Sequence, residues 1–502
     1  MIKTNFKRIL LYILILIRPC LLIAGQVTIE NARRVADVHS QFGRTVEIRS
    51  GRPQSLVPEF SVREVTPVTA ETDQVLFYVA ELEPEGFIAI SSKEDITPVI
   101  AYSYRRDFCF QSSDENILLG MLISDAGMRI DALKVTDDKV LRSNRELWSG
   151  YLEEGVLEDY IGRAGQWPDR SRGWLDTAWH QSAPYNDLVP VDPSTGKRAV
   201  AGCVATAIAQ IVNYHKYPKS IALDDFYDSY TTETRKIRIP DDFSELGFPS
   251  FSVLNGKLGN INYFDPSEGF APALNFACGI LVEMDYTSTS SGARMDSAHR
   301  IFTDRLGYDR AEFLLEDTNP GFFYSTIISD MKEARPALLA IFTDSYYGHA
   351  IVVDGYRETG MYHLNFGWGS KEPDPMESCW YSLPEGMPAG FSVVAFGITE
   401  ITSPDQNPYN RYREPVSYPN PFRLSSNDTA RIALPSTPDG VIESVRIYSA
   451  SGSFVRELEG GDLFADWDGR NASGRRCAPG LYFYVVRTSG NGVHRGRMTL
   501  VP

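Results

Sequence analysis

A lone cysteine stands at the head of an apolar helical segment, and this segment constrains the fold more than any other part of the chain. Gly202 comes directly before Cys203 and lets the backbone turn sharply, and Pro218 marks the end of the helix. Apolar residues in between recur at the spacing of one helical face: Val204, Ala207, Ile208, Ile211 and Val212. The sequence therefore predicts a buried helix with Cys203 in its first turn.

A cysteine in this position has two properties of a nucleophile. The exposed amides and the dipole at the start of a helix stabilise the thiolate, which is the reactive form of the side chain. The same amides can donate hydrogen bonds to an oxyanion. Most free cysteines are nevertheless small buried apolar residues, so Cys203 needs a base before it can be assigned a catalytic role.

Seven histidines are available, and His349 fits the role of the base best. It opens an apolar strand that runs from Ala350 to Tyr356, at a distance along the chain known for papain-like cysteine–histidine pairs. The other histidines lie in flanking regions, on the helix of Cys203 itself, or in ordinary surface or core surroundings: His39, His180, His215, His299, His363 and His494.

A second strand returns from Met361 after a tight turn. If Tyr356 faces Met361, Asn365 and Trp368 come within reach of the His349 ring. An amide oxygen on one ring nitrogen fixes the tautomer and aims the other nitrogen at the sulfur, and an indole shields that contact from water. The alternative for Asn365 is an ordinary turn residue at the end of a strand.

A loop precedes the helix over residues 177–186, as Pro184 and Asn186 indicate. The side-chain amide of Gln181 in this loop could supply a second oxyanion donor beside the Cys203 amide. The alternative is a surface glutamine without a role.

These residues resemble the streptopain family of secreted cysteine peptidases, over roughly residues 150–400. The motifs that carry the resemblance are 202–207 with 210–211 and 214–218, 348–350, 365–369, 181–186, 284–286 and 290–292. The resemblance implies a papain-like α+β core, with a helical part and an antiparallel sheet. It implies catalytic roles for Cys203, His349, Asn365 and Gln181, substrate contacts for Gly348, Ser291 and Trp368, and neither a metal nor an organic cofactor.

The chain departs from the family pattern at two positions. Phe366 stands where the family usually has Trp, and Ser370 stands where it has a second Gly. Neither change removes a group that handles protons. The loss of the indole at position 366 could alter the shielding of the site or the fit of the substrate.

The region before the motifs holds strand-like runs at 75–79 and 86–90 and a helical pattern at 115–135. Its segments 86–92 and 98–103 resemble the inhibitory pro-segment of the same family, which implies autoinhibition released by cleavage. We therefore expect an α+β pro-domain over residues 26–140 and a peptidase domain over residues 141–402.

The end of the chain reads as a separate unit. A polar joint at 403–417 is followed, over 418–502, by short strand-like runs between turns, which predict a small antiparallel β-sandwich. Segments 418–422, 467–471 and 479–484 resemble the C-terminal Ig-like sandwich domains of the flagellar-hook-capping and type IX secretion kind. The resemblance implies a sorting domain that directs the protein to the outer-membrane secretion machinery. The alternative is a plain structural appendage.

The first 25 residues read as an export signal. Basic residues at the start precede an apolar run from Ile9 to Ile17, which is shorter than the about 20 residues that span a bilayer. The alternative is an uncleaved anchor.

A net charge of −16 argues against nucleic acid as a partner, and six scattered cysteines without a CxxC pair exclude a zinc knuckle or a dense disulfide framework.

The sequence thus predicts a secreted or cell-surface cysteine endopeptidase that is made as a zymogen, with its own pro-domain as inhibitor. It would hydrolyse proteins or peptides through a thioester of Cys203. Two other functions stay open. One is a thiol amidase or cell-wall hydrolase on a similar fold, and the other is a surface-binding protein with a degenerate papain-like unit.

Overall fold

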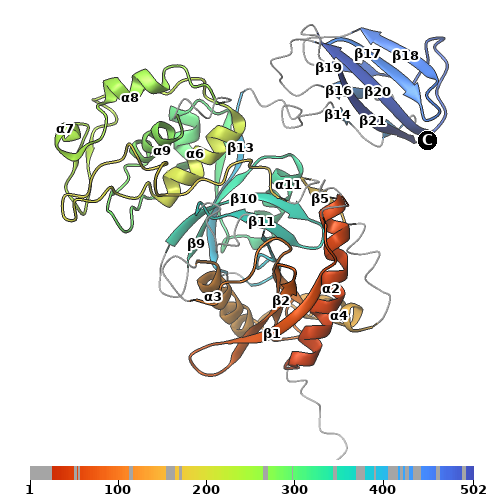
Figure 1. Ribbon diagram of the computed structural model, residues 1–502, viewed down its shortest axis with the longest axis horizontal. Coiled ribbons are helices and arrows are strands. Elements are labelled where there is room, and N and C mark those ends of the chain that lie inside the picture. The colour runs from red at the N-terminus through yellow and green to blue at the C-terminus, as the bar shows by residue number, and fades with distance from the viewer. Residues whose placement is uncertain are drawn as a thin grey trace, which may run out of the picture. The chain divides into compact units, whose positions relative to one another are not determined.

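The computed structural model describes most of the chain, and the part up to residue 404 combines helices and strands, which confirms a mixed helix-and-sheet fold (Figure 1). The described residues are 25–49, 54, 57–111, 117–153, 164–168, 172–263, 270–296, 298–342, 348–368, 379–388, 390, 392–404, 416–418, 422–423, 429–433, 442–459, 464–488 and 493–501. The predicted export signal up to residue 24 and most of the joint at 403–417 lie outside them. The chain divides into two compact units, 1–404 and 405–502.

The first part of unit 1 contains the elements that the sequence predicts at 75–79, 86–90 and 115–135. They are α2 (Ile29–Arg49), β1 (Ser61–Thr69), β2 (Val75–Glu83), β3 (Phe87–Ser91), β4 (Val99–Ser103), α3 (Ile117–Ala132) and α4 (Asp138–Leu152). Side chains alternate between the two sheet faces, so that α2 and α4 pack on one face of β2 and β3 and α3 packs on the other. This alternation buries β3 and β4 on both sides and explains why they read as continuous apolar runs.

The second part of unit 1 combines a helical half with an antiparallel sheet. Its elements are β5 (Gln166–Trp167), α6 (Cys203–His215), β6 (Tyr230–Thr231), β7 (Arg238–Ile239), α7 (Phe243–Leu246), α8 (Phe251–Leu258), α9 (Phe270–Leu281), α10 (Ala298–Arg300), η3 (Ile301–Arg305), β8 (Arg310–Leu315), α11 (Pro320–Lys332), β9 (Ala337–Phe342), β10 (Gly348–Arg357), β11 (Met361–Asn365), β12 (Trp380–Tyr381) and β13 (Val394–Thr402). Helix α6 lies between α9 and β10. It is buried all round from Val204 to Asn213, so the prediction of one buried face is too narrow.

One sheet runs through both parts of unit 1, in the order β1-β2-β3-β4-β12-β11-β10-β9-β13-β8. The two parts meet where β4 pairs with β12, with Tyr102 opposite Trp380 and Ala101 opposite Tyr381. Just beyond β12, the amide of Ser382 donates a hydrogen bond of 2.8 Å to the carbonyl of Ile100. The predicted pro-domain and the predicted peptidase domain therefore share one continuous sheet.

A buried ion pair on α3 strengthens this junction. Arg129 and Asp125 lie 2.8 Å apart, with side chains 4% and 6% exposed. The Arg129 guanidinium also donates to the carbonyl of Ser382, on the other side of the junction. Helix α3 is thereby tied to the segment that follows β12.

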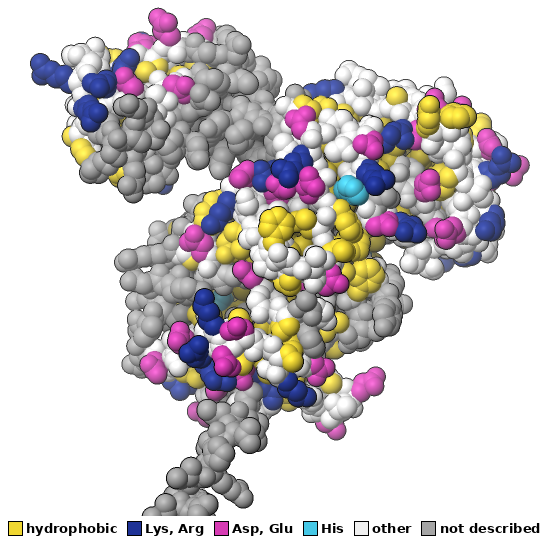
Figure 2. All heavy atoms as spheres, turned by 180° about the vertical axis from the view of Figure 1, so that it is seen from behind, with side chains coloured by type: hydrophobic (Ala, Val, Ile, Leu, Met, Phe, Trp, Pro, Cys, Tyr) yellow, Lys and Arg dark blue, Asp and Glu magenta, His cyan; other side chains and the backbone are white. Residues whose placement is uncertain are grey.

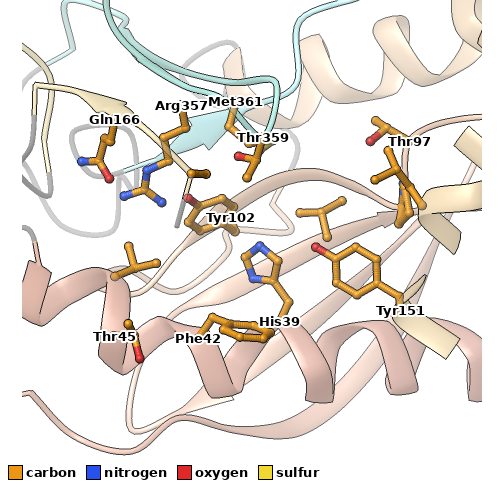
Figure 3. Close-up of a pocket in the computed structure, with 15 residues that line it drawn as sticks. His39, Phe42, Thr45, Thr97, Tyr102, Tyr151, Gln166, Arg357, Thr359 and Met361 are labelled. Atoms are coloured by element: carbon orange, nitrogen blue, oxygen red, sulfur yellow. The ribbon is translucent and has the colours of Figure 1, made fainter. Parts of the chain in front are cut away.

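A small cavity of about 50 Å³ lies between the two parts of unit 1. Figure 3 shows His39 and Phe42 of α2 facing Tyr102 of β4, with Arg357 and Met361 of the β10–β11 hairpin on the opposite side. A cavity of this size holds a few water molecules at most. Its lining contains none of the predicted site residues.

The C-terminal unit consists of two sheets. One contains β14 (Val416–Tyr418), β16 (Ala430–Ala433) and β19 (Phe464–Trp467), and the other contains β15 (Phe422–Arg423), β21 (Val493–Val501), β20 (Gly480–Thr488), β17 (Ile442–Ser449) and β18 (Phe454–Glu459). Alternate residues of β20 point inward and join a single apolar cluster around Trp467.

The surface carries charges of both signs. On the face in Figure 2, Lys and Arg side chains of the described residues lie among Asp and Glu side chains and do not gather into one patch. In the part of the chain that the structure describes, no helix is long and apolar enough to cross a membrane.

Candidate active site

Helix α6 begins at Cys203, as the sequence predicts. Gly202 caps the helix with φ +90°, and a Cβ atom at this position would lie 2.5 Å from the Sδ atom of Met284. Only glycine adopts this backbone conformation readily and also leaves the necessary space. The turn therefore brings Cys203 to the edge of the core, where the residue as a whole is half-buried.

The Cys203 thiol lies against the start of β10. The backbone amides of Ala350, Val204 and Cys203 itself face the thiol and lower its pKa. Burial has the larger effect and raises the pKa of the thiol above its ordinary value. In this conformation desolvation therefore opposes the thiolate that the amides at the helix start favour.

His349 precedes Ala350, so the topology brings the predicted base to the strand that contacts the sulfur. The imidazole is 5% exposed, and burial lowers its pKa to about 4 despite a hydrogen bond to the Phe366 carbonyl. A direct hydrogen bond between the Cys203 sulfur and the His349 ring is absent from the contacts of the residues that the structure describes. The ring is therefore neutral near pH 7 and stands next to a protonated thiol.

Two groups meet the Nε2 atom of His349. The carbonyl oxygen of Phe366 lies 2.8 Å away and the indole Nε1 of Trp368 lies 3.0 Å away. A carbonyl only accepts and an indole only donates, so the two contacts need opposite protonation states of Nε2. When Nε2 carries the proton and donates to Phe366, Nδ1 keeps the lone pair that can take a proton from a thiol.

Asn365 lies opposite Val352, as predicted, but its side chain does not bond the His349 ring. Its Oδ1 accepts from the amide of Gly367 at 3.0 Å, and its Nδ2 donates to the carbonyl of Thr177 at 3.0 Å. The direct orienting hydrogen bond from Asn365 to His349 is thus not made in this conformation. The Phe366 carbonyl takes that place, because the tight turn after β11 directs it toward the ring.

The predicted register of the hairpin needs one correction. Met361 pairs with Arg357 instead of Tyr356, and a bulge at Asp354 then shifts the ladder by one residue. The shift restores the predicted alignment of Asn365, and it leaves His349 in contact with Trp368 as expected.

The predicted oxyanion loop lies beside the segment that leads into α6. The carbonyl of Gln181 accepts from the amide of Ala201 at 2.9 Å, and His180 forms a β-bridge with Trp368. The Gln181 side chain is half-buried. The loop is thus held between the nucleophile segment and the tryptophan that touches His349.

The predicted substrate residues lie around the same region. Gly348 is exposed at the start of β10, and a Cβ atom there would lie 2.8 Å from the ring of Phe342. The carbonyl of Ser291 lies 3.4 Å from the position of a Cβ on Gly202. The Ser291 hydroxyl is already used within its own turn, since it bonds the amide and the carbonyl of Thr287. Any contact of Ser291 with a substrate would therefore come from its backbone.

Sequence reasoning missed two buried polar residues. Asp354 is 1% exposed, contacts Nδ1 of His363 at 2.6 Å and accepts from the amide of Leu175 at 2.9 Å. Gln210 of α6 is fully buried and contacts Asn365. The available signal was a polar residue inside an otherwise apolar run. Among the described residues, no group of three or more His, Cys, Asp or Glu side chains could hold a metal ion.

Comparisons with known proteins match two regions of the chain. Residues 179–374 match the model of the Peptidase C10 family, and residues 24–130 match the model of the Spi protease inhibitor. The chain is 29% identical to the thiol protease/hemagglutinin PrtT of Porphyromonas gingivalis, over 72% of this chain and 40% of that protein. It is 28% identical to streptopain of Streptococcus pyogenes, over 58% of this chain and 71% of that protein.

Two solved structures from Prevotella intermedia are also similar. A fragment of prointerpain A has 20% identity and a TM-score of 0.46, and it covers 68% of this chain and 99% of its own. Active interpain A cysteine protease has 25% identity and a TM-score of 0.34, and it covers 47% of this chain and 94% of its own.

Proposed function

We propose that this chain, whose residues 179–374 match the model of the Peptidase C10 family, is a secreted cysteine endopeptidase made as an inactive precursor. The observation that carries the proposal is the contact between the Cys203 thiol and the amide of Ala350, directly beside the buried imidazole of His349. The fold of the catalytic part is papain-like in this proposal, over residues 141–402.

Each of these residues has a role in peptide-bond hydrolysis. His349 takes the proton of the Cys203 thiol, and the sulfur attacks the carbonyl carbon of the scissile bond. The Cys203 amide and the Gln181 side chain stabilise the resulting oxyanion. His349 then protonates the leaving amine, and water hydrolyses the thioester with His349 as base. Trp368 shields the ring.

Substrate binding and orientation involve three further residues. Gly348 is exposed and has no side chain, so a substrate backbone can approach it closely. The Ser291 carbonyl lies beside the turn at Gly202 and borders the same cleft. Asn365 orients the base through the turn that it holds, because its Oδ1 fixes the Gly367 amide next to Phe366.

The electrostatics of the pair support a latent precursor. Burial raises the pKa of Cys203 and lowers that of His349 to about 4, so the neutral thiol and the neutral ring are favoured near pH 7. Hydration of the site would reverse both shifts and favour the thiolate–imidazolium pair. Residues 26–140 serve as the inhibitor in this proposal, and their match to an inhibitor model over 24–130 supports that role.

We further propose the roles of the chain ends. Residues 1–25 direct export, and residues 418–502, after a joint at 403–417, form an Ig-like β-sandwich that addresses the outer-membrane secretion machinery. Two sheets around one apolar cluster support the sandwich. A structural appendage is the second candidate for this unit.

The test compares the wild-type chain with Cys203→Ala, both produced without residues 1–25. The wild type is expected to shorten itself over time and then to digest casein, while the variant stays at full length. An epoxide thiol inhibitor is expected to label Cys203 after shortening. Labelling of Cys203 with intact casein would favour an amidase or cell-wall hydrolase. Absence of both labelling and digestion would favour a binding protein, and the peptidase proposal would then be wrong.

A further inference from the structure

A buried amide side chain on α6 faces the same way as the nucleophile. Gln210 comes seven residues after Cys203, which is about two helical turns or roughly 10 Å along the axis. Residues at this spacing share one face of a helix. Gln210 is fully buried, in an otherwise apolar helix, and a buried amide is costly unless its hydrogen bonds are satisfied.

Gln210 satisfies its hydrogen bonds with two segments that are distant in sequence. Its Oε1 accepts from the hydroxyl of Thr177 at 3.0 Å and from the amide of Trp179 at 3.1 Å. Its Nε2 donates to Oδ1 of Asn365 at 3.2 Å, and Nδ2 of Asn365 donates back to Oε1 at 3.3 Å. The side chain therefore links α6, the loop before Gln181 and the turn after β11.

The orientation of both amides is fixed by backbone groups. The amide of Trp179 can only donate, so it must face the oxygen of Gln210. The carbonyl of Thr177 can only accept and the amide of Gly367 can only donate, so they fix the nitrogen and the oxygen of Asn365. Rotating either side-chain amide by 180° would set donors against donors and acceptors against acceptors.

The turn that Asn365 holds carries the two groups that touch the imidazole. The Phe366 carbonyl and the Trp368 indole both lie within 3.0 Å of Nε2 of His349. A displacement of this turn would change the position of the ring and its hydrogen bonds. The loop from Thr177 also leads, four residues on, to Gln181.

We propose that Gln210 is a positioning residue for hydrolysis at Cys203. Its side-chain amide keeps the turn that contacts His349 and the loop that carries Gln181 in register with the helix of the nucleophile. This inference rests on the proposed peptidase function and adds a residue that touches neither substrate nor the reacting atoms.

Two substitutions test it. Gln210→Glu has the same shape but presents an acceptor to Oδ1 of Asn365, unless the new carboxyl is protonated. Burial raises the pKa of such a carboxyl. We expect kcat to fall by about 10²-fold at alkaline pH, the loss that a displacement of roughly 1 Å can cause, and to recover as pH falls. Gln210→Met removes all the hydrogen bonds of the Gln210 side chain, so kcat should be lower at every pH, with KM little changed.

A second measurement does not require peptidase activity. Iodoacetamide alkylation of Cys203 in the full-length chain, followed by peptide mass, reports how the thiol is activated at each pH. Both variants are expected to shift the pH midpoint of alkylation. Asn275→Asp is the matched control, because Asn275 is a fully buried amide of α9 whose Nδ2 donates within its own helix to Ala271. It should lower thermal stability and leave the alkylation profile unchanged.

The outcomes separate this inference from the proposed function. If the wild type digests casein and both Gln210 variants keep its kcat and its alkylation profile, the positioning role is wrong. The role is also wrong if Asn275→Asp shifts the profile as much as they do. If the wild type leaves casein intact but only the Gln210 variants shift the profile, Gln210 still positions the groups around the Cys203 thiol, and the peptidase proposal fails.

Discussion

The ion pair on α3 gives a strong test of how the two parts of unit 1 are held together. Arg129 and Asp125 are almost completely buried at 2.8 Å, and Arg129 also donates to the carbonyl of Ser382 beyond the β4–β12 junction. Burial raises the pKa of Asp125, while the Arg129 charge and hydrogen bond oppose this rise. Arg129→Met would leave a carboxylate in the core without its cation.

The size of the effect follows from the burial. Removing one partner of a buried ion pair costs about 3–5 kcal/mol, because the remaining charge is desolvated and uncompensated. Since every 1.4 kcal/mol is about a factor of ten, opening of α3 should become about 10²- to 10⁴-fold more frequent. The double variant Asp125→Leu with Arg129→Met should recover much of the loss, because it removes both charges.

Hydrogen exchange of the α3 amides measures this opening directly. The measurement uses the full-length chain with Cys203→Ala, so that self-cleavage cannot interfere. Arg44→Met is the matched control, since Arg44 pairs with Glu59 at 3.1 Å with side chains 38% and 86% exposed. An exposed pair contributes about 1 kcal/mol or less. If Arg129→Met accelerates exchange no more than Arg44→Met does, the reasoning from burial is refuted.

Three further predictions follow from buried groups. Burial lowers the pKa of His39 to about 3, so the folded protein holds the neutral ring. The contribution of His39 to the free energy of unfolding should therefore be constant above pH 6.5 and decline by up to about 1.4 kcal/mol per pH unit below it. His39→Gln should remove that share of the decline, and an unchanged acid titration of α2 exchange would contradict this. Phe366→Trp should lower the melting temperature, because Phe366 is 1% exposed against Tyr381 and overpacking costs about 1–3 kcal/mol; a higher melting temperature would show that the site has room. Gly202→Ala should cost about 1–3 kcal/mol, because φ +90° with ψ +136° strains a residue that has a Cβ atom. It also adds a clash against Met284, and it should reduce both thermal stability and kcat; a variant as stable and active as the wild type would refute the argument.

Apolar periodicity predicts the main elements well. The helix at Cys203, the strand at His349 and the placement of Asn365 opposite Val352 all agree with the structure. Each depends on local patterns or on a tight hairpin turn, whose geometry limits the possible registers. The bulge at Asp354 could not be read in the same way, because Asp354 bonds the amide of Leu175, which lies in another part of the chain.

The electrostatics of the site could not be predicted from local sequence. The start of a helix favours a thiolate, but the pKa of Cys203 also depends on how much water the folded chain excludes. The partner of His349 likewise depends on which group of the β11 turn reaches the ring, and the Phe366 carbonyl replaces the Asn365 amide there. Gln210 looked like one residue of a helical motif until tertiary contacts revealed its partners.

The sharing of one sheet across the β4–β12 junction has a consequence for maturation. Loss of β1 to β4 would turn β12 into an outer strand, with unpaired backbone groups at Trp380 and Tyr381. Edge strands can pair with strands of other chains, and natural proteins limit this aggregation by keeping edge strands short. Because β12 is two residues long, the exposed edge strand offers few backbone groups with which another strand could pair. Separation from the precursor would thus cost few strand-to-strand hydrogen bonds, but it would uncover the apolar side chains of Trp380 and Tyr381, which the first part of unit 1 now buries.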